Sequence, residues 1–153
     1  MKIVIFGDTH DNIANIKHVM GYAKKIKAEA IIHTGDWSSL KAYEAVKSYG
    51  IKIYGVLGNA DISPEIKSKF KDFLEFEIDD LKIGLIHNIK KAKLEFFKNK
   101  DVVFTGHYHK QQKWIQKDGF CIRPGSLENN INFAILDCRK KMISFVSNNN
   151  YVD

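Results

Sequence analysis

Five short apolar segments of the sequence each end at a polar side chain that can bind a metal ion, in most cases beside a glycine. The segments cover residues 3–6, 30–32, 51–57, 83–86 and 102–105. The side chains that follow them are Asp8 and His10, Asp36, Asn59, His87, and His107 and His109. Short apolar runs rich in β-branched residues are typical of buried strands. Ligands of an open α/β sheet bind outside the carboxyl ends of its strands, so we expect these side chains to meet at one rim, provided that the strands form one sheet.

The first third of the chain alternates strands with helices. The expected elements are a strand at residues 3–6, a helix at 12–27, a strand at 30–33, a helix at 40–49 and a strand at 51–57. The first helix carries apolar side chains at helical spacing, and the second is closed by Gly50, a residue that commonly ends helices. This order implies parallel strands joined by right-handed crossovers.

The second half of the chain has a different pattern. We expect a hairpin of residues 73–78 and 81–87, a helix at 92–98, a strand at 102–105, and antiparallel strands at 114–116, 120–123, 133–137 and 142–147. No linker, low-complexity tract or internal repeat divides the sequence. The chain is therefore predicted to be one α/β domain over residues 1–153, parallel in its first half and mixed in its second.

Charge and composition narrow the choice of partners. The formal net charge is +6, but the lysines are spread along the whole chain, which favours a solvated basic surface over a nucleic-acid-binding stripe. Cys121 and Cys138 lie far apart in apolar segments, so we expect buried, reduced thiols. No apolar stretch is long enough to cross a membrane, and the chain begins directly with a strand, so we expect a cytoplasmic protein. Homo-oligomerisation is left open.

Each of these polar residues also has an ordinary structural explanation when it is taken alone. Asp8 and Asp36 could cap helices, Asn59 could serve a turn, and a lone His87 would more often be a solvated or hydrogen-bonded histidine. These explanations must all hold independently, whereas a metal site accounts for the five positions together. Two other histidines fall outside this pattern: His33 lies within a strand and is expected to be structural, and His18 lies in the first helix and is expected at the surface.

The set of ligand atoms indicates which metals would bind. Two aspartates, an asparagine and four histidines form a mixed oxygen and nitrogen site without thiolate. Such a set suits manganese, iron, cobalt, nickel or zinc better than magnesium or calcium, and of these we expect manganese. Seven ligands are too many for one tetrahedral ion, which favours two divalent ions that share a carboxylate. Two ions about 3.5–4 Å apart are the usual clamp for phosphoryl displacement.

Read in order, Asp8-Thr9-His10, Gly35-Asp36, Gly58-Asn59, His87 and Gly106-His107-Tyr108-His109 resemble the motifs of the calcineurin-like metallophosphoesterase superfamily. The resemblance continues weakly to Pro124-Gly125-Ser126. The short chain further resembles the small single-domain prokaryotic phosphodiesterase branch, which is shared with the retromer subunit of this fold.

The resemblance implies a four-layer αββα sandwich with mixed sheets and a two-metal site at the carboxyl-terminal rim of the strands. One metal would be held by Asp8, His10, Asp36 and His109. Asp36 would bridge to a second metal held by Asn59, His87 and His107. The implied reaction is hydrolysis of a phosphate ester, most simply a diester, by a hydroxide activated on the two metals. Asp36, Asn59 and His87 would take part in catalysis, with Asn59 helping to hold the phosphate.

Four positions depart from the family pattern. Ala60 stands where the family usually has His or Cys, followed here by Asp61; Asp11 and Asn88 stand where Gly is common; and Arg123 replaces the usual Asn before the late turn. Ala60 removes a side chain that is often assigned to leaving-group protonation. Asp61, Tyr108 and Arg123 are the candidate substrate contacts that would compensate for it.

Two other functions are considered. The first is a non-catalytic scaffold that docks protein partners, as the retromer subunit does. Because a scaffold can lose its ligands freely and this chain retains every one, the enzyme is preferred. The second is a nuclease or nucleic-acid-binding role, prompted only by the basic charge, and it ranks third because the chain lacks the extra domain expected of a processive nuclease.

Overall fold

Strand β1 (Lys2–Phe6) is buried on both faces, and the two faces belong to different layers. Ile3 and Ile5 pack into the core between two sheets, whereas Val4 and Phe6 pack against helices. This follows from the period of two along a strand, which sends successive side chains to opposite faces. A computed structural model describes residues 1–148 of the protein.

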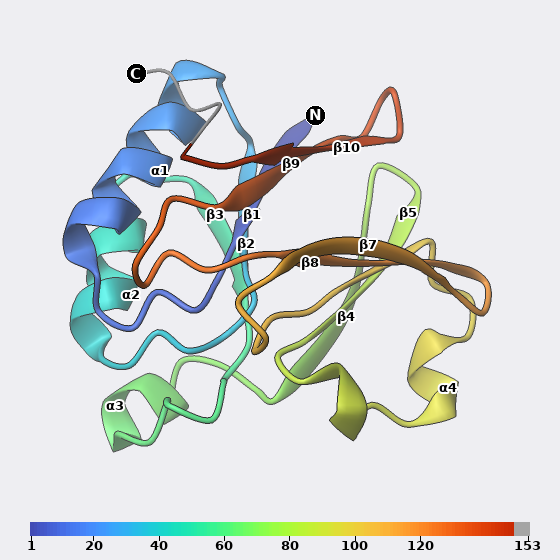
Figure 1. The fold of residues 1–153 in the computed structure, drawn as a ribbon, viewed down its shortest axis with the longest axis horizontal. Helices are drawn as coiled ribbons and strands as arrows, with labels where there is room; N and C mark the ends of the chain where they lie inside the picture. Colours follow the sequence, from blue (N-terminus) through green and yellow to red (C-terminus); the bar gives the residue numbers. More distant parts are fainter. Residues whose placement is uncertain (149–153) are drawn as a thin grey trace.

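The first sheet has the strand order β10-β9-β1-β2-β3 (Figure 1). Strands β1, β2 (Ala30–His33) and β3 (Lys52–Gly55) are parallel, as predicted from their helical crossovers. Strand β9 (Phe133–Asp137) joins the other edge of β1 in the antiparallel direction, and β10 (Met142–Val146) extends it. The carboxyl ends of β1, β2 and β3 therefore lie at one rim.

The second sheet has the order β4-β5-β6-β8-β7. Its strands are β4 (Phe73–Ile78), β5 (Leu81–Ile86), β6 (Val102–Phe104), β7 (Gln111–Gln116) and β8 (Gly119–Pro124). The parallel pairs β5–β6 and β6–β8 lie in the middle, and an antiparallel strand closes each edge. The two sheets face each other across a core that includes Ile5, Ile32, Leu85 and Phe104.

Helices cover the outer faces of the sheets. On the first sheet, α1 (Ile13–Lys25) and α2 (Leu40–Lys47) lie side by side (Figure 1), and the side chains of Asn12 and Ser39 cap their amino ends. On the second sheet, the short α4 (Leu94–Phe97) places Phe96 and Phe97 against Val103 and Cys121. The molecule is thus a four-layer αββα arrangement, as the resemblance implied. None of the helices among residues 1–148 is long and apolar enough to span a membrane.

The strands that end in candidate ligands are divided between the two sheets, so two rims meet at the site. The helices differ from the sequence-based expectation in two places. The helix expected at 92–98 is reduced to α4 and is preceded by a 3₁₀ turn η1 (Ile89–Lys91), whose Lys90 N–H bonds to the Asn88 side chain. A short helix α3 (Pro64–Lys67) was missed, although Ser63 before Pro64 is a standard start signal.

Candidate metal centre

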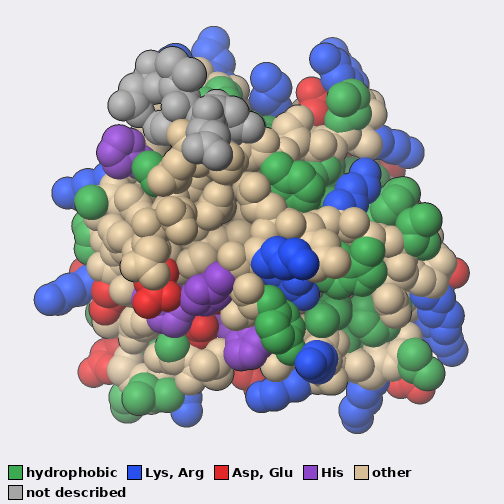
Figure 2. Space-filling view, in the orientation of Figure 1, with side chains coloured by type: hydrophobic (Ala, Val, Ile, Leu, Met, Phe, Trp, Pro, Cys, Tyr) green, Lys and Arg blue, Asp and Glu red, His purple; other side chains and the backbone are tan. Residues whose placement is uncertain are grey.

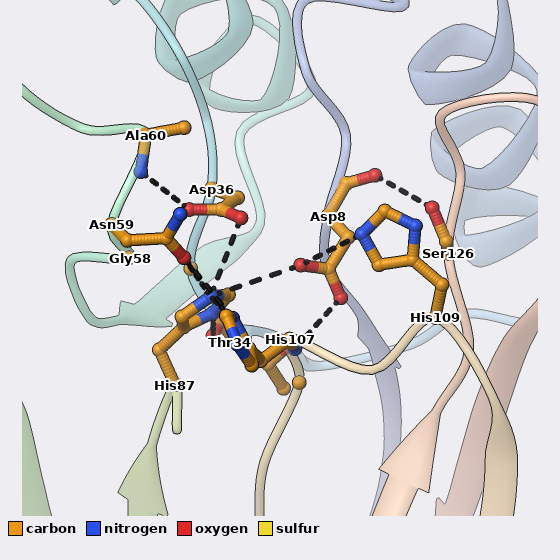
Figure 3. A network of polar contacts seen from close by, with 12 residues as sticks. Asp8, Thr34, Asp36, Gly58, Asn59, Ala60, His87, His107, His109 and Ser126 are labelled. Atoms are coloured by element: carbon orange, nitrogen blue, oxygen red, sulfur yellow. Dashed lines mark hydrogen bonds and ion pairs between the residues drawn. The ribbon is translucent and has the colours of Figure 1, made fainter. Parts of the chain in front are cut away.

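The side chains predicted as ligands meet where the strands of both sheets end (Figure 3). Five of them have a left-handed backbone, with φ values of 47° at Asp8, 42° at His10, 63° at Asp36, 75° at His107 and 53° at His109. Such conformations cost non-glycine residues about 1–3 kcal/mol each and concentrate at functional sites. The turns after β1, β2 and β6 are therefore held in shapes that aim these side chains inward.

Two glycines make room for the ligands. A Cβ at Gly58 would lie 2.1 Å from Asp36 Oδ1, and a Cβ at Gly35 would lie 2.7 Å from His87 Nδ1. Gly35 also has a φ of 102°, which side chains other than glycine rarely adopt. The glycines beside the candidate ligands are thus required by the close approach of neighbouring loops.

Asp8, His10 and His109 form the first group of candidate ligands. One ligand atom from each lies within 4.8 Å of the others, and His109 Nε2 is 3.6 Å from Asp8 Oδ1. Two buried atoms of this group, Asp8 Oδ1 and His10 Nε2, have no hydrogen-bond partner in the part of the chain that the structure describes. The other Asp8 oxygen accepts the backbone N–H of His107 at 3.1 Å, which fixes the carboxylate.

Asp36, Asn59, His87 and His107 form the second group. His87 Nδ1 lies 2.8 Å from the carbonyl oxygen of Thr34, which can only accept, so Nδ1 carries a hydrogen, and the ring presents the lone pair of Nε2 whenever it is neutral. Around this Nε2 lie Asn59 Oδ1 at 3.0 Å, His107 Nδ1 at 3.3 Å and Asp36 Oδ2 at 3.3 Å. Atoms with lone pairs thus converge on one point from three loops.

The electrostatics of the two aspartates favour a cation. Burial, reinforced by Asp36, raises the pKa of Asp8 to about 7 against the opposing effect of His87. Burial also acts to raise the pKa of Asp36, but the hydrogen bonds with His87 and the Ala60 N–H lower it to about 2. For His87, burial lowers the pKa, and the two carboxylates outweigh that effect and raise it. The buried carboxylates of Asp8 and Asp36, next to the imidazole of His87, are stabilised by a positive charge placed between them.

The arrangement fits divalent metal ions. The orphaned Asp8 Oδ1 and His10 Nε2, and the crowded nitrogens and oxygens around His87, would all gain a partner from a cation. The donors are carboxylate, amide and imidazole, the set that transition ions accept. The Thr34 carbonyl supplies the second hydrogen bond that orients a metal-binding histidine.

His33 is buried and structural in its contacts, as expected from its position in a strand. Its Nδ1 accepts the Gly35 N–H at 3.0 Å, so Nε2 carries the hydrogen and donates to Thr9 Oγ1 at 3.2 Å. The ring stacks on Trp37 at a centroid distance of 3.6 Å. His33 therefore ties together the two loops that carry Asp8 and Asp36. His18 is exposed on α1, also as expected.

The three candidate substrate contacts differ in their exposure. Asp61 is 2% exposed and accepts the backbone N–H groups of Asp36, Ser38 and Gly58. Its carboxylate therefore holds these loops together and is turned away from solvent. Arg123 is buried as well. Its Nε donates to the Gly106 carbonyl at 3.2 Å.

Tyr108 alone of these three candidates is open to solvent, with 40% of its surface exposed. Its ring faces the guanidinium of Arg123 at 4.9 Å, which places it over this buried residue of β8. Tyr108 therefore keeps its candidacy as a substrate contact.

Two residues near the centre were not identified from the sequence. Glu128 lies 3.9 Å from His10 Nε2 and 3.7 Å from His109 Nδ1, and Ser126 Oγ donates to the Asp8 carbonyl at 3.0 Å. Both follow Gly125, whose φ is 93°, in the late Pro124-Gly125-Ser126 turn. The turn in the sequence was the signal that could have identified these two residues, because it returns the chain to the loop after β1.

Comparisons with known proteins agree with this geometry. The family model described as the calcineurin-like phosphoesterase superfamily domain matches residues 1–141. A phosphodiesterase of Methanocaldococcus jannaschii is 32% identical over an alignment of 158 positions, which covers 92% of this chain and 95% of the relative.

Solved structures share the fold. An archaeal phosphodiesterase superposes with a TM-score of 0.83 at 30% identity, over 96% of this chain and 99% of that one. A single mutant of Vps29 from Entamoeba histolytica superposes with a TM-score of 0.70 at 18% identity, over 96% and 99% of the two chains. The chain therefore belongs to the calcineurin-like phosphoesterase superfamily.

Proposed function

We propose that the protein is a phosphodiesterase that works with two divalent metal ions. The observation that carries this proposal is the position of Asp36 Oδ2. It lies 3.4 Å from His10 Nε2 in the first group of ligands and 3.3 Å from His87 Nε2 in the second. One carboxylate oxygen at nearly equal distances from both groups is the geometry expected of a bridging ligand.

The ligands divide into two sets around this carboxylate. Asp8, His10 and His109 would hold one ion together with Asp36. Asn59, His87 and His107 would hold the other. The mixed oxygen and nitrogen donors favour a transition ion, with manganese preferred and iron, nickel, cobalt or zinc as alternatives.

The residues of the chain then have distinct roles. When bound, two such ions would supply an activated water and positive charge for the developing charge on the phosphate. The Ala60 N–H, 2.9 Å from Asp36 Oδ1, orients the bridging carboxylate. The Asn59 side chain turns its Oδ1 toward His87 and His107, and its amide nitrogen can donate to a phosphate oxygen.

Membership of the superfamily and the archaeal phosphodiesterase relatives support a diester as the substrate. The histidines and acidic side chains gathered on one face of the molecule, bordered by lysine or arginine and hydrophobic side chains, are consistent with a site for an anionic ligand (Figure 2). A cytoplasmic location and the absence of a membrane partner stay predictions of the sequence, and nucleic acid stays the less favoured partner.

The test is metal-dependent hydrolysis. The purified protein is stripped of metal, reloaded separately with each of the five ions, and assayed with bis(4-nitrophenyl) phosphate and 4-nitrophenyl phosphate. We expect turnover of the diester that needs a transition ion and exceeds turnover of the monoester. Two bound ions without hydrolysis of any ester would favour the scaffold function instead.

A further inference from the structure

A cavity of about 490 Å³ opens from the second group of candidate ligands. One wall is formed by Asn59, His87 and His107. The lining also includes the apolar side chains of Phe73 and Ile86. Its volume falls in the range of sites that hold small organic ligands, so it is large enough for a substituent attached to a phosphate at the metal centre.

The β4–β5 hairpin places Phe73 next to the centre. Phe73 pairs with Ile86 in the register of the two strands, and His87 is the residue directly after β5. The Phe73 side chain is 53% exposed, which is unusual for a phenyl ring beside a candidate active site. An apolar ring exposed at a concave site indicates a ligand-binding surface.

The Phe73 ring is held from beneath while it stays open to the cavity. The ring of Phe96, a buried residue of α4, meets it edge to face at a centroid distance of 5.8 Å and an angle of 87°. Aromatic pairs of this kind fix the orientation of both rings. The Phe73 ring is thus already oriented, and its side chain loses little conformational freedom when a ligand stacks on it.

Lys91 adds positive charge to the same cavity. It is the last residue of η1, is exposed, and lines the cavity together with Phe73 and His107. Its ammonium would attract an anionic ester, against the opposing charge of Asp72 in the same lining.

A second hollow of about 260 Å³ continues from the first. It shares Phe73, Ile86 and Lys91 with the cavity, and its other lining residues are Glu75, Ala92, Lys93, Glu95 and Phe96. The two hollows make one groove that leads from the candidate metal ligands over an aromatic floor. The groove is continuous with the proposed catalytic site, so its natural occupant is a part of the substrate itself.

We propose that this groove binds a planar aromatic substituent of the phosphate ester, of the aryl or nucleobase class, stacked on Phe73. Stacking on aromatic side chains is available to every base and aryl ring because each has a π-face. This inference rests on the proposed function for the position of the phosphate. It adds a substrate class, an aromatic phosphodiester, that the metal ligands alone do not specify.

The experiment measures binding without turnover, so that its result tests the groove independently of the proposed hydrolysis. Metal-loaded protein is titrated calorimetrically with phenylphosphonate, cyclohexylphosphonate and methylphosphonate, which cannot be hydrolysed. We expect phenylphosphonate to bind about fivefold more tightly than cyclohexylphosphonate, since aromatic stacking adds to simple burial of apolar area. Phe73→Leu should remove this preference and leave the affinity for inorganic phosphate unchanged.

The matched control is Phe120→Leu. Phe120 is a similarly exposed phenylalanine, at 44%, on β8, and it lies outside the groove. This variant should keep the parent's preference for phenylphosphonate. Equal affinity for the phenyl and cyclohexyl compounds in the parent protein would overturn the inference, and so would a preference that survives in Phe73→Leu. Either result would leave the two-metal proposal intact, because that proposal depends on hydrolysis and metal content.

Discussion

His87 Nδ1 donates a hydrogen bond of 2.8 Å to the Thr34 carbonyl oxygen, and this bond links the end of the second sheet to the loop that carries Asp36. Because the hydrogen sits on Nδ1, the other ring nitrogen is directed at Asp36 and Asn59 with its lone pair. The position of the His87 ring is thus set before any ion binds.

Replacing His87 with alanine should lower the hydrolysis of bis(4-nitrophenyl) phosphate by roughly 10²–10³-fold, the range found when one preorganised stabilising group is removed. Far-UV circular dichroism should stay unchanged, because the side chain lies at the rim and outside the hydrophobic clusters. His18→Ala, on the exposed side of α1, is the control and should hydrolyse the diester at the parent rate. A His87→Ala variant as fast as the parent would show that the site is wrongly assigned.

Replacing Asp36 with alanine should remove both metal ions together. The reason is that Asp36 Oδ2 lies 3.4 Å from His10 Nε2 and 3.3 Å from His87 Nε2, so neither site is complete without it. Elemental analysis of the reloaded proteins should give up to two ions per chain for the parent and for Glu44→Ala, a surface carboxylate of α2, and none for Asp36→Ala. Retention of one ion per chain in the Asp36 variant would count against a bridging role.

His33→Gln should affect stability more than chemistry. The buried ring links the Gly35 N–H to Thr9 Oγ1 and stacks on Trp37, and breaking such a buried hydrogen bond costs about 1–3 kcal/mol. Urea denaturation should show a lower free energy of unfolding by that amount. Turnover per folded molecule should stay within a few-fold of the parent. The opposite pattern, full stability with lost turnover, would place His33 in the chemistry.

The cysteines give a prediction about pH. Burial raises the pKa of the Cys121 thiol to about 11, and burial raises the pKa of Cys138 as well. A raised pKa means less thiolate at pH 8 than an ordinary cysteine has, and only the thiolate reacts with alkylating reagents. Iodoacetamide at pH 8 should therefore leave both cysteines of the native protein unmodified by mass spectrometry, and should modify both in urea. Rapid labelling of the native protein at Cys121 would contradict its burial.

The sequence predicted the local elements around the centre better than their partners in space. The ends of β1, β2, β5 and β6 were found because each is a short apolar run followed by a ligand residue. The strand pattern alone did not assign them to one sheet or the other, because a buried strand has the same pattern of side chains in either sheet. The pairing of Ile3 with Leu136, far apart in the chain, joins β9 and β10 to the first sheet.

Contacts between segments that are distant in the chain also could not be predicted from the sequence. Glu128 reaches His10 and His109 only because the turn at Gly125 returns the chain to the β1 loop. Asp61 follows a predicted ligand closely and therefore suggested contact with substrate. The structure shows three backbone N–H groups from two loops converging on it, an arrangement that no local pattern specifies.

The final prediction concerns Ala60. Its backbone N–H holds Asp36, but its methyl group can neither donate a proton nor bind a phosphate oxygen. Positioned general acids contribute typically 10²–10⁴-fold, and the need is greatest when the leaving group is poor. The enzyme should therefore favour diesters with acidic leaving groups, such as aryl diesters, over alkyl diesters.

Ala60→His should reduce the preference for aryl over alkyl diesters, because it supplies a proton donor beside Asn59. The measurement is the ratio of turnover for bis(4-nitrophenyl) phosphate to that for an alkyl diester, in parent and variant at equal metal content. Ala60→Leu is the control, because it adds similar bulk without a proton, and it should leave the ratio unchanged. A ratio that is also unchanged in a well-folded Ala60→His variant would mean that the leaving group takes its proton from elsewhere. Tyr108, exposed on the neighbouring loop, would then be the side chain to replace next, because Asp61 is already engaged by the backbone.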